Sequence, residues 1–314
     1  MERMLAHETW FTDARPAFDW AFAWEPATLV GVTLAIAVAC AWRVVGHRLP
    51  RPELPFLVPL GRLAPWVPRL LAIHAGVSLL AQAARHTYLA PALVLPSSPV
   101  GIGLTICEGI LGVWLISGVH VRIAAIAVVA AGPLGMLQYG VVPILERMDL
   151  LGIALFLVVL QPGPDRFGAA STEPARVARA TFSLRALVGG ALIVLAFTEK
   201  LINPDLALAF LHRFPAFNLA RTMGVQMDDP TFIRIAGAIE LLFGLLILSG
   251  TMPQLVVIAA GIPFNATLFY LGSEELIGHL PVYGAMLAMI VYGSSRELAR
   301  VVDVFPPMRR VVPT

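Results

Sequence analysis

Long apolar stretches separated by short polar segments dominate the chain. The hydrocarbon core of a bilayer is about 30 Å thick, so a helix needs roughly 20 apolar residues to cross it. This criterion predicts nine transmembrane helices, at residues 27–46, 67–84, 100–118, 121–142, 149–161, 184–201, 232–250, 254–272 and 279–294. The fifth is short, and residues 143–148 can extend it where protein rather than lipid surrounds them.

The composition favours a membrane location and excludes several other classes of protein. Hydrophobic residues make up 58% of the 314 residues and charged residues only 13%, whereas soluble domains carry roughly a quarter charged residues. The net charge of +2 is spread among the loops, which argues against nucleic-acid binding. Cys40 and Cys107 lie in apolar runs without CxxC spacing, so we expect no disulfide framework, thiolate zinc site or attached haem.

The basic residues predict the orientation of the chain in the membrane. With the N-terminus outside, most of the 22 Lys and Arg residues fall in the segments assigned to the cytoplasm. An odd number of spans then places the C-terminus in the cytoplasm. Residues 1–25 are aromatic and acidic, so we interpret them as an interfacial segment rather than a cleaved signal peptide. Lys200 is the only lysine, which fits a GC-rich bacterial genome and hence a bacterial inner membrane.

An internal repeat appears when the chain is compared with itself at an offset of 132 residues. Residues 107–112 align with 239–244, Ser117-Gly118 with Ser249-Gly250, and Gly152 with Gly284. Four helices per copy give both copies the same orientation, so we expect a pseudo-twofold axis along the membrane normal. The predicted fold is an all-α polytopic bundle with an N-terminal segment, first repeat, cytoplasmic linker, second repeat and cytoplasmic tail at residues 1–66, 67–161, 162–183, 184–294 and 295–314.

Two carboxylates stand at equivalent positions inside predicted spans. Placing Glu108 and Glu240 in a membrane costs free energy unless their carboxylates are paired or hydrated. Arg85 and Lys200 end the preceding helices and are the candidate ion-pair partners of Glu108 and Glu240 respectively. We favour such structural pairs, which hold helices together. The alternative is a carboxylate that handles protons or orients a ligand.

Three further polar residues are candidates for a ligand pocket. Glu275 and His279 lie one helical turn apart, a spacing that suits a metal, but no convincing third ligand accompanies them. We therefore predict no metal site and favour a polar helix cap at the membrane surface. Asn265 follows Pro263 in a predicted span, where it either satisfies a carbonyl freed by the proline or contributes to a ligand pocket.

The sequence offers little for a bound redox cofactor. Haem b in a helical bundle needs axial ligands within the spans, and His74 is the only histidine placed there. No glycine-rich phosphate loop or flavin fingerprint is present. If the protein takes part in electron transfer, another subunit or a diffusible quinone must carry the electrons.

The second repeat resembles the DoxX and DoxD-like membrane proteins, which are four-helix units of similar length. The resemblance is carried by Glu199-Lys200-Leu201 with Asn203-Pro204, by residues 237–244, and by Leu248-Ser249-Gly250. The first repeat is similar at Glu108, Gly112 and Ser117-Gly118 but has Arg85-His86 in place of Lys200-Leu201. The resemblance implies an association with redox systems, since DoxD-type members are linked to thiosulfate:quinone oxidoreductase and others to oxidative-stress complexes.

These observations lead to one favoured hypothesis and two alternatives. We expect an integral membrane subunit of a redox or quinone-linked complex, without its own redox cofactor, whose partners are the lipid bilayer and a redox enzyme. Whether it is itself an enzyme stays open, and an accessory subunit is favoured. The alternatives are a proton-coupled transporter of a small molecule or lipid, and a membrane assembly or scaffold protein.

Overall fold

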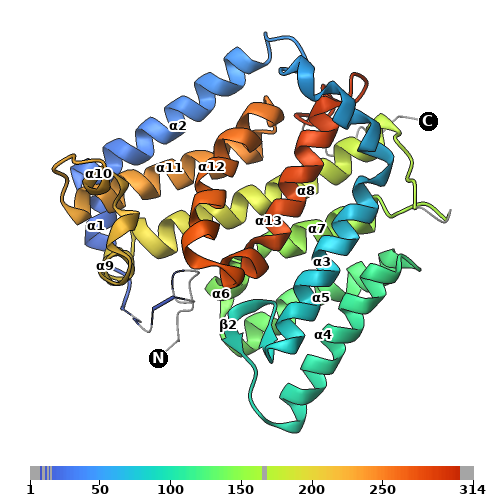
Figure 1. Ribbon diagram of the computed structural model, residues 1–314, viewed down its shortest axis with the longest axis horizontal. Helices are drawn as coiled ribbons and strands as arrows, with labels where there is room; N and C mark the ends of the chain where they lie inside the picture. Colours follow the sequence, from blue (N-terminus) through green and yellow to red (C-terminus); the bar gives the residue numbers. More distant parts are fainter. Residues whose placement is uncertain (1–7, 9–10, 13, 15, 165–167, 305–314) are drawn as a thin grey trace, which may run out of the picture.

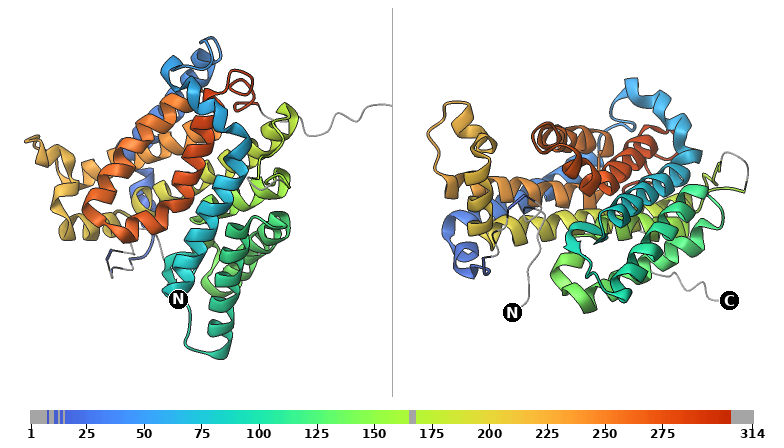
Figure 2. Two further views of the ribbon diagram at one scale, coloured as in Figure 1. Left: turned by 45° about the vertical axis from the view of Figure 1, so that its right-hand side comes forward. Right: turned by 60° about the horizontal axis from the view of Figure 1, so that its bottom comes forward.

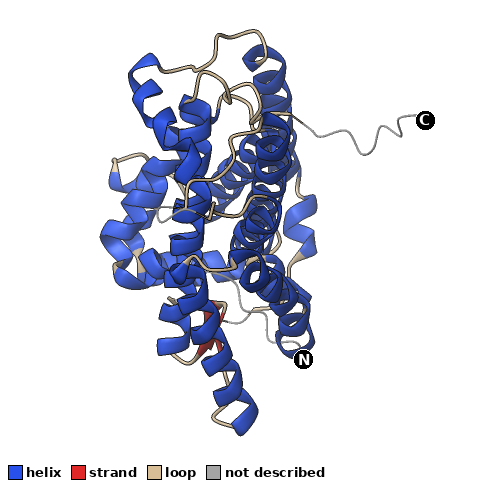
Figure 3. Cartoon of the chain, turned by 90° about the vertical axis from the view of Figure 1, so that its right-hand side faces the viewer, coloured by secondary structure: helices blue, strands red, loops and turns tan. Residues whose placement is uncertain are grey.

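A computed structural model of the chain describes residue 8, residues 11–12, residue 14, residues 16–164 and residues 168–304. Within these residues the protein is a bundle of helices with one small hairpin (Figures 1 and 3). Residues 305–314, the end of the predicted cytoplasmic tail, lie outside the described residues.

The first half of the chain supplies eight helices and the hairpin. These elements are α1 (Trp20–Trp24), α2 (Pro26–Gly46), the 3-10 helix η2 (Pro55–Trp66), α3 (Val67–Ala84), β1 (Thr87–Tyr88), β2 (Ala90–Val94), α4 (Pro99–Ser117), α5 (Val121–Tyr139), α6 (Val141–Leu145) and α7 (Met148–Val159). The hairpin is antiparallel and pairs Tyr88 with Ala90. It lies in the connection between α3 and α4.

Every regular element described in the second half of the chain is a helix. Its elements are α8 (Pro174–Leu195), the π-helix η3 (Ala196–Leu201), α9 (Pro204–Arg213), the 3-10 helix η4 (Pro215–Phe217), α10 (Leu219–Thr222), α11 (Asp229–Ser249), α12 (Pro253–Leu271) and α13 (Ser273–Ser294). Helices α9 and α10 project from one end of the bundle, as two views show (Figures 1 and 2).

The helices fit a protein that crosses a membrane several times. Among the described residues, eight helices are long and apolar enough to span a bilayer. The coarse prediction of an all-α bundle with several apolar helices of membrane-spanning length is thereby confirmed. The predicted fifth span corresponds to α7, which has only 12 residues. Residues 143–148 do not extend it as one helix, because α6 and α7 are separate helices.

Two segments predicted as linkers contain helix. Helix α8 begins at Pro174, so part of the predicted linker 162–183 is helical. Its first turns contain Arg176 and Arg179. Because charged residues lower the local hydropathy, the predicted span began only at residue 184. The predicted proline-rich linker before residue 67 contains η2, whose internal prolines Pro59 and Pro65 lack the N–H groups of a regular α-helix.

Close backbone contacts at glycines fix the central helix pairs. A Cβ atom at Gly112 of α4 would lie 2.8 Å from the carbonyl oxygen of Gly76 of α3, and one at Gly244 of α11 would lie 2.9 Å from that of Gly189 of α8. Real Cβ atoms essentially never come so close to a neighbouring atom. Glycine at these positions therefore allows the two backbones to approach, as small residues do in membrane helix pairs.

The two halves of the chain also pack against each other. Gly152 of α7 faces Leu187 of α8, and a Cβ there would lie 3.0 Å from the Leu187 Cβ. Gly284 of α13 faces His74 of α3, and a Cβ at Gly284 would lie 3.1 Å from the His74 Cβ. The last helix of each predicted repeat thus contacts the first helix of the other, α7 with α8 and α13 with α3. In Figure 1, α3, α7, α8 and α13 occupy the middle of the bundle.

Arginines bind the carbonyl ends of two helices. Arg69 donates to the carbonyl of Leu115 at the end of α4, at 3.3 Å. Arg185 donates to the carbonyl of Ser249 at the end of α11 at 2.6 Å, and Arg43 of α2 donates to the same oxygen at 2.8 Å. Cations are favoured at helix C-termini because the last carbonyls carry partial negative charge. These contacts hold the end of α4 against α3, and the end of α11 against α8 and α2.

Candidate functional site

An apolar cavity of about 360 Å³ lies between the helices of the second half of the chain. Side chains from η3, α8, α9, α11, α12 and α13 line it. Most of the lining is aliphatic or aromatic, and the aromatic residues are Phe210, Phe217, Phe232, Phe243 and Phe264. Charged residues occupy a small part of the wall, which distinguishes the cavity from an ordinary gap in a hydrophobic core.

Lys200 is the centre of the charged part of this cavity. Its Nζ lies 3.1 Å from Glu240 Oε2, 3.4 Å from Glu199 Oε2 and 3.2 Å from Glu8 Oε1. The side chains of Lys200 and Glu240 are 18% and 24% exposed, and those of Glu8 and Glu199 are buried. One ammonium group therefore faces three carboxylates in a place that water reaches only in part.

The predicted pairing of Lys200 with Glu240 is thus formed. It joins η3 to α11, at a point where α11 also approaches η3 closely: a Cβ at Gly237 would lie 3.1 Å from the Lys200 Cβ. The contact that the structural interpretation requires is therefore present. Its position on the wall of a cavity also leaves the alternative open, since both groups can contact a bound molecule.

A local widening of the helix presents Glu199 and Lys200. The backbone from Ala196 to Leu201 is a π-helix, and the N–H of Ile202 donates to the carbonyl of Phe197, five residues earlier, at 2.9 Å. Such π-turns insert one extra residue into a helix and occur frequently at functional sites. The sequence pattern predicted a regular helix over residues 184–201, because hydropathy does not report hydrogen-bond spacing.

Glu8 belongs to the site although the sequence analysis did not select it. Its backbone N–H donates to Glu199 Oε1 at 2.8 Å, across 191 residues of sequence. Burial raises the pKa of the Glu8 carboxyl to about 7, and the positive charge of Lys200 opposes this shift. Phe11 packs edge-on against Phe210 and Phe214 of the same region, at 6.3 and 6.4 Å between ring centroids. Glu8 of the acidic and aromatic N-terminal segment therefore lines the cavity, and the interfacial location of the segment stays a prediction.

Glu275 and His279 line the same cavity from α13. The His279 Nδ1 lies 3.3 Å from Glu275 Oε1 and 3.2 Å from the Glu275 carbonyl oxygen. Both side chains are buried, and Glu275 lies in the first turn of α13. The polar cap at the membrane surface stays a prediction. The ring of Phe264 meets the His279 ring edge-on at 5.1 Å. No group of three His, Cys, Asp or Glu residues suited to a metal ion occurs within the described residues.

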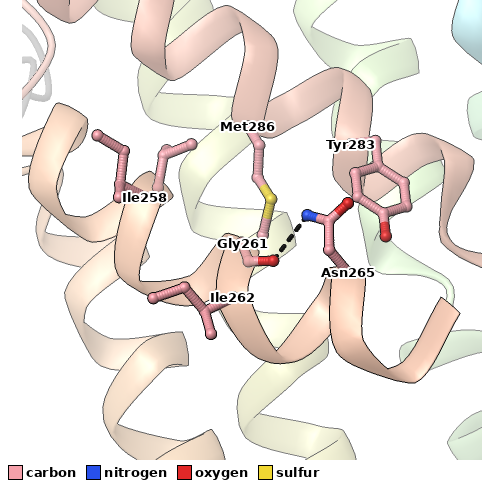
Figure 4. Close-up of a pocket in the computed structure, with 7 residues that line it drawn as sticks. Ile258, Gly261, Ile262, Asn265, Tyr283 and Met286 are labelled. Carbon is pink, nitrogen blue, oxygen red and sulfur yellow. Dashed lines mark hydrogen bonds between the residues drawn. The ribbon is translucent and has the colours of Figure 1, made fainter. Parts of the chain in front are cut away.

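Asn265 faces a different hollow. It lies with Val257, Ile258, Gly261, Ile262, Tyr283 and Met286 along an open groove on the outside of α12 and α13 (Figure 4). Its Nδ2 donates to the carbonyl of Gly261 at 2.7 Å. The carbonyl that loses its donor to Pro263 is that of Ala259, four residues earlier. Asn265 therefore does not satisfy the freed carbonyl, and that interpretation was wrong. Asn265 does not belong to the cavity around Lys200.

Glu108 has another environment than its counterpart Glu240. Its Oε1 accepts a hydrogen bond of 2.9 Å from the N–H of Leu89 in the hairpin, and its Oε2 has no partner among the described residues. The predicted Arg85–Glu108 pair is not present, because Arg85 lies 3.6 Å from Glu274 at the start of α13. The hairpin supplies Glu108 with a backbone donor, whereas Glu240 has the Lys200 ammonium. No such hairpin occurs in the described part of the second half.

A further buried polar contact lies beside the cavity. Thr198 of η3 donates to Glu146 Oε1 at 2.7 Å. Glu146, together with the buried Arg147 and Asp149, lies at the break between α6 and α7. The sequence analysis treated these residues only as an extension of a helix. Glu146, Arg147 and Asp149 are three ionisable residues within four consecutive positions, at the start of a predicted span. This cluster was the signal that could have identified them.

Comparisons with known proteins do not add an identity. No family model, no curated protein and no solved structure matches the chain. The resemblance to the DoxX and DoxD-like proteins therefore stays an expectation from the residues quoted for it. The fold and the cavity are the basis on which a function can be proposed.

Proposed function

We propose that this protein is the quinone-binding membrane subunit of a redox complex, and that the cavity around Lys200 holds the quinone head group. The observation that supports this most is the combination of an aromatic and aliphatic cavity with Lys200, Glu240 and His279 on its wall. Ligand sites of this kind are mostly apolar and contain a few polar groups that fix orientation.

The residues on the cavity wall suit a head group that exchanges protons. Lys200 is a hydrogen-bond donor for a carbonyl oxygen, and His279 can either donate or accept. Glu240, which is partly exposed, is placed to pass a proton between the cavity and Lys200. A quinone takes up two electrons and two protons to form a quinol. The electrons would come from a partner oxidoreductase, and the residues of this chain would bind the ring and handle the protons.

The same proposal includes the arrangement in the membrane. We take α7 as a ninth, short span between protein neighbours, with two parallel four-helix repeats and the N-terminus outside a bacterial inner membrane. Supporting this layout, the glycine contacts at Gly112 and Gly244 and the positive-φ caps at Gly118 and Gly250 each recur 132 residues apart. Repeats with an even number of spans share one orientation.

Quinone binding can be measured directly on the purified chain. Titration of a short-chain quinone into the detergent-solubilised protein, followed by native mass spectrometry, should give a one-to-one complex. Lys200→Gln should weaken it about tenfold or more, since a hydrogen bond to a charged group contributes roughly 1.5–3 kcal/mol. Ala236→Phe should block binding by filling the cavity.

A matched substitution controls for loss of fold. Ile126→Phe adds the same ring on an exposed face of α5 and should leave quinone binding unchanged. If the folded wild-type chain binds no quinone at concentrations that saturate known quinone sites, the proposed function is wrong. Recovery of an oxidoreductase with the chain from native membranes would support the complex independently of the quinone.

A proton-coupled transporter is the second candidate, and one observation favours it. Glu199 and Glu240 share one lysine inside the region that crosses the membrane, an arrangement suited to binding and releasing a proton. Proteoliposomes containing the chain and a pH-sensitive dye would distinguish the two functions. Substrate-dependent proton flux that Glu240→Gln abolishes would replace the quinone-subunit proposal.

A further inference from the structure

A second cavity, of about 530 Å³, lies at the other end of α13. Three segments far apart in the sequence form it: η2, the segment before α8, and the turn after α13. Residues from Val58 to Pro65 form one wall, and Thr172 and residues 295–298 form the others. It shares no residue with the cavity around Lys200.

The walls are held together by specific contacts. A Cβ at Gly61 would lie 2.7 Å from the Ser295 Cα, so glycine is what allows η2 to touch the end of α13. The N–H of Ala170 donates to the carbonyl of Pro65 at 2.7 Å, which ties the segment before α8 to the end of η2. Leu298 is buried beneath the turn. The cavity is therefore built into the fold and does not depend on one loop.

Two arginines give this cavity its chemistry. Arg62 and Arg296 both line it, both are exposed, and neither forms an ion pair within the described part of the chain. Other arginines at this end are engaged: Arg51, for example, pairs with Glu53 and Asp303. Glu297 also lines the cavity and partly offsets the positive charge.

The donors in the cavity fit a phosphate group. Guanidinium groups bind phosphate oxygens with paired hydrogen bonds, and the hydroxyls of Thr172 and Ser295 add further donors. Phosphate could come from a lipid head group or from a soluble phosphate. The lipid is favoured because η2 leads directly into the spanning helix α3 and exposes Phe56, Leu63 and Trp66, which suit acyl chains and the membrane interface.

We propose that the cavity between η2, Thr172 and the turn after α13 binds the phosphate of an anionic phospholipid through Arg62 and Arg296. The site is independent of the quinone proposal, since it uses other residues at the opposite end of α13. The three segments all belong to stretches that the basic-residue pattern assigns to the cytoplasmic side. The lipid is therefore one of the inner leaflet.

Lipid titration on the purified full-length chain tests this site. Native mass spectrometry with phosphatidylglycerol and with phosphatidylcholine should show preferential retention of phosphatidylglycerol by the wild type. The double variant Arg62→Gln, Arg296→Gln should weaken phosphatidylglycerol binding by roughly 25-fold, about fivefold for each arginine. Phosphatidylcholine binding should weaken less, because choline offsets the charge of its phosphate. Glu297→Gln should strengthen it, because a competing negative charge is removed.

A matched control and two outcomes make the test decisive. Arg122→Gln removes another exposed arginine that lies outside the cavity, and it should leave phosphatidylglycerol binding unchanged. Equal retention of the two lipids by the wild type would overturn the proposal. Inorganic phosphate that binds the lipid-free chain and displaces phosphatidylglycerol at millimolar concentration would assign the site to a soluble phosphate instead.

Discussion

The Lys200 ammonium lies 3.1 Å from the Glu240 carboxylate, across the contact between η3 and α11. Glu199 and Glu8 lie within 3.4 Å of the same ammonium, so the lysine compensates more than one buried acid. A buried ion pair adds little net stability compared with apolar groups, but loss of one partner is costly because the other charge stays buried. The single lysine of the chain is therefore the residue on which this region depends most.

The first prediction rests on that asymmetry. Lys200→Met should destabilise the protein by about 3–5 kcal/mol, because it leaves the carboxylates of Glu199 and Glu240 without their shared cation. Adding Glu240→Gln and Glu199→Gln to Lys200→Met should recover part of the loss. Thermal unfolding in detergent measures both changes, with the fraction of protein that stays monodisperse at each temperature as the readout.

Arg85 supplies the matched control for this prediction. It occupies the corresponding place in the first half, but its side chain is 33% exposed and it pairs with the half-exposed Glu274 at 3.6 Å. Exposed pairs contribute roughly 0–1 kcal/mol, so Arg85→Met should change stability little. A loss for Arg85→Met as large as that for Lys200→Met would contradict the assignment of Lys200 as the buried cation.

A second prediction concerns the glycine contacts. Gly112→Ala and Gly244→Ala should each cost about 1–3 kcal/mol, because a Cβ would meet the backbone of the neighbouring helix. Gly103→Ala in the same helix α4 is the control, since nothing lies within 4 Å of the added atom and alanine favours helix. In thermal unfolding, Gly103→Ala should be at least as stable as the wild type, and Gly112→Ala and Gly244→Ala should be less stable. Gly112→Ala and Gly244→Ala variants as stable as Gly103→Ala would show that the helices are not in close contact here.

A third prediction concerns pH and Glu8. Its pKa of about 7 in the folded protein lies above the ordinary value, so the folded state binds this proton more tightly than the unfolded state. Folding stability contributed by this group is therefore highest at low pH and falls as the pH rises from about 4.5 through 7. Glu8→Gln removes the titration, so the variant should gain stability relative to the wild type between pH 5 and pH 8.

Thermal unfolding of the two proteins across that pH range measures the effect. Glu25→Gln, at a half-exposed carboxylate of the same N-terminal region, serves as the control. Its difference from the wild type should vary less with pH than that of Glu8→Gln. A pH-independent difference for Glu8→Gln would show that burial does not hold the proton on this carboxyl.

A fourth prediction separates the two equivalent glutamates. Glu108 accepts a hydrogen bond from Leu89, and an amide oxygen can do the same, so Glu108→Gln should be nearly neutral. Glu108→Leu leaves the buried Leu89 N–H without its partner and should cost about 1–3 kcal/mol. Quinone binding should be unaffected in Glu108→Gln but reduced in Glu240→Gln. Equal effects at the two positions would argue against separate roles.

Particular residues show how far the sequence could lead. The offset of 132 residues identified Gly112 and Gly244, and both lie at close helix contacts. The pairing of Lys200 with Glu240 was inferred from helix ends and sequence distance alone, and it is formed. The same reasoning failed for Arg85, because the hairpin supplies Glu108 with a backbone donor and leaves the arginine to Glu274.

The sequence by itself determined the class of protein, the approximate position of its helices and the glycines at which helices touch. These features depend on local composition and spacing, because each span must satisfy its own backbone in an apolar surrounding. Only the tertiary structure decided which groups meet, for example Glu8 with Lys200 and Arg62 with Arg296 at one cavity. The partner of a buried charge depends on how each helix is rotated about its axis and on which distant segments pack beside it. The hydropathy of the sequence gives no information on either.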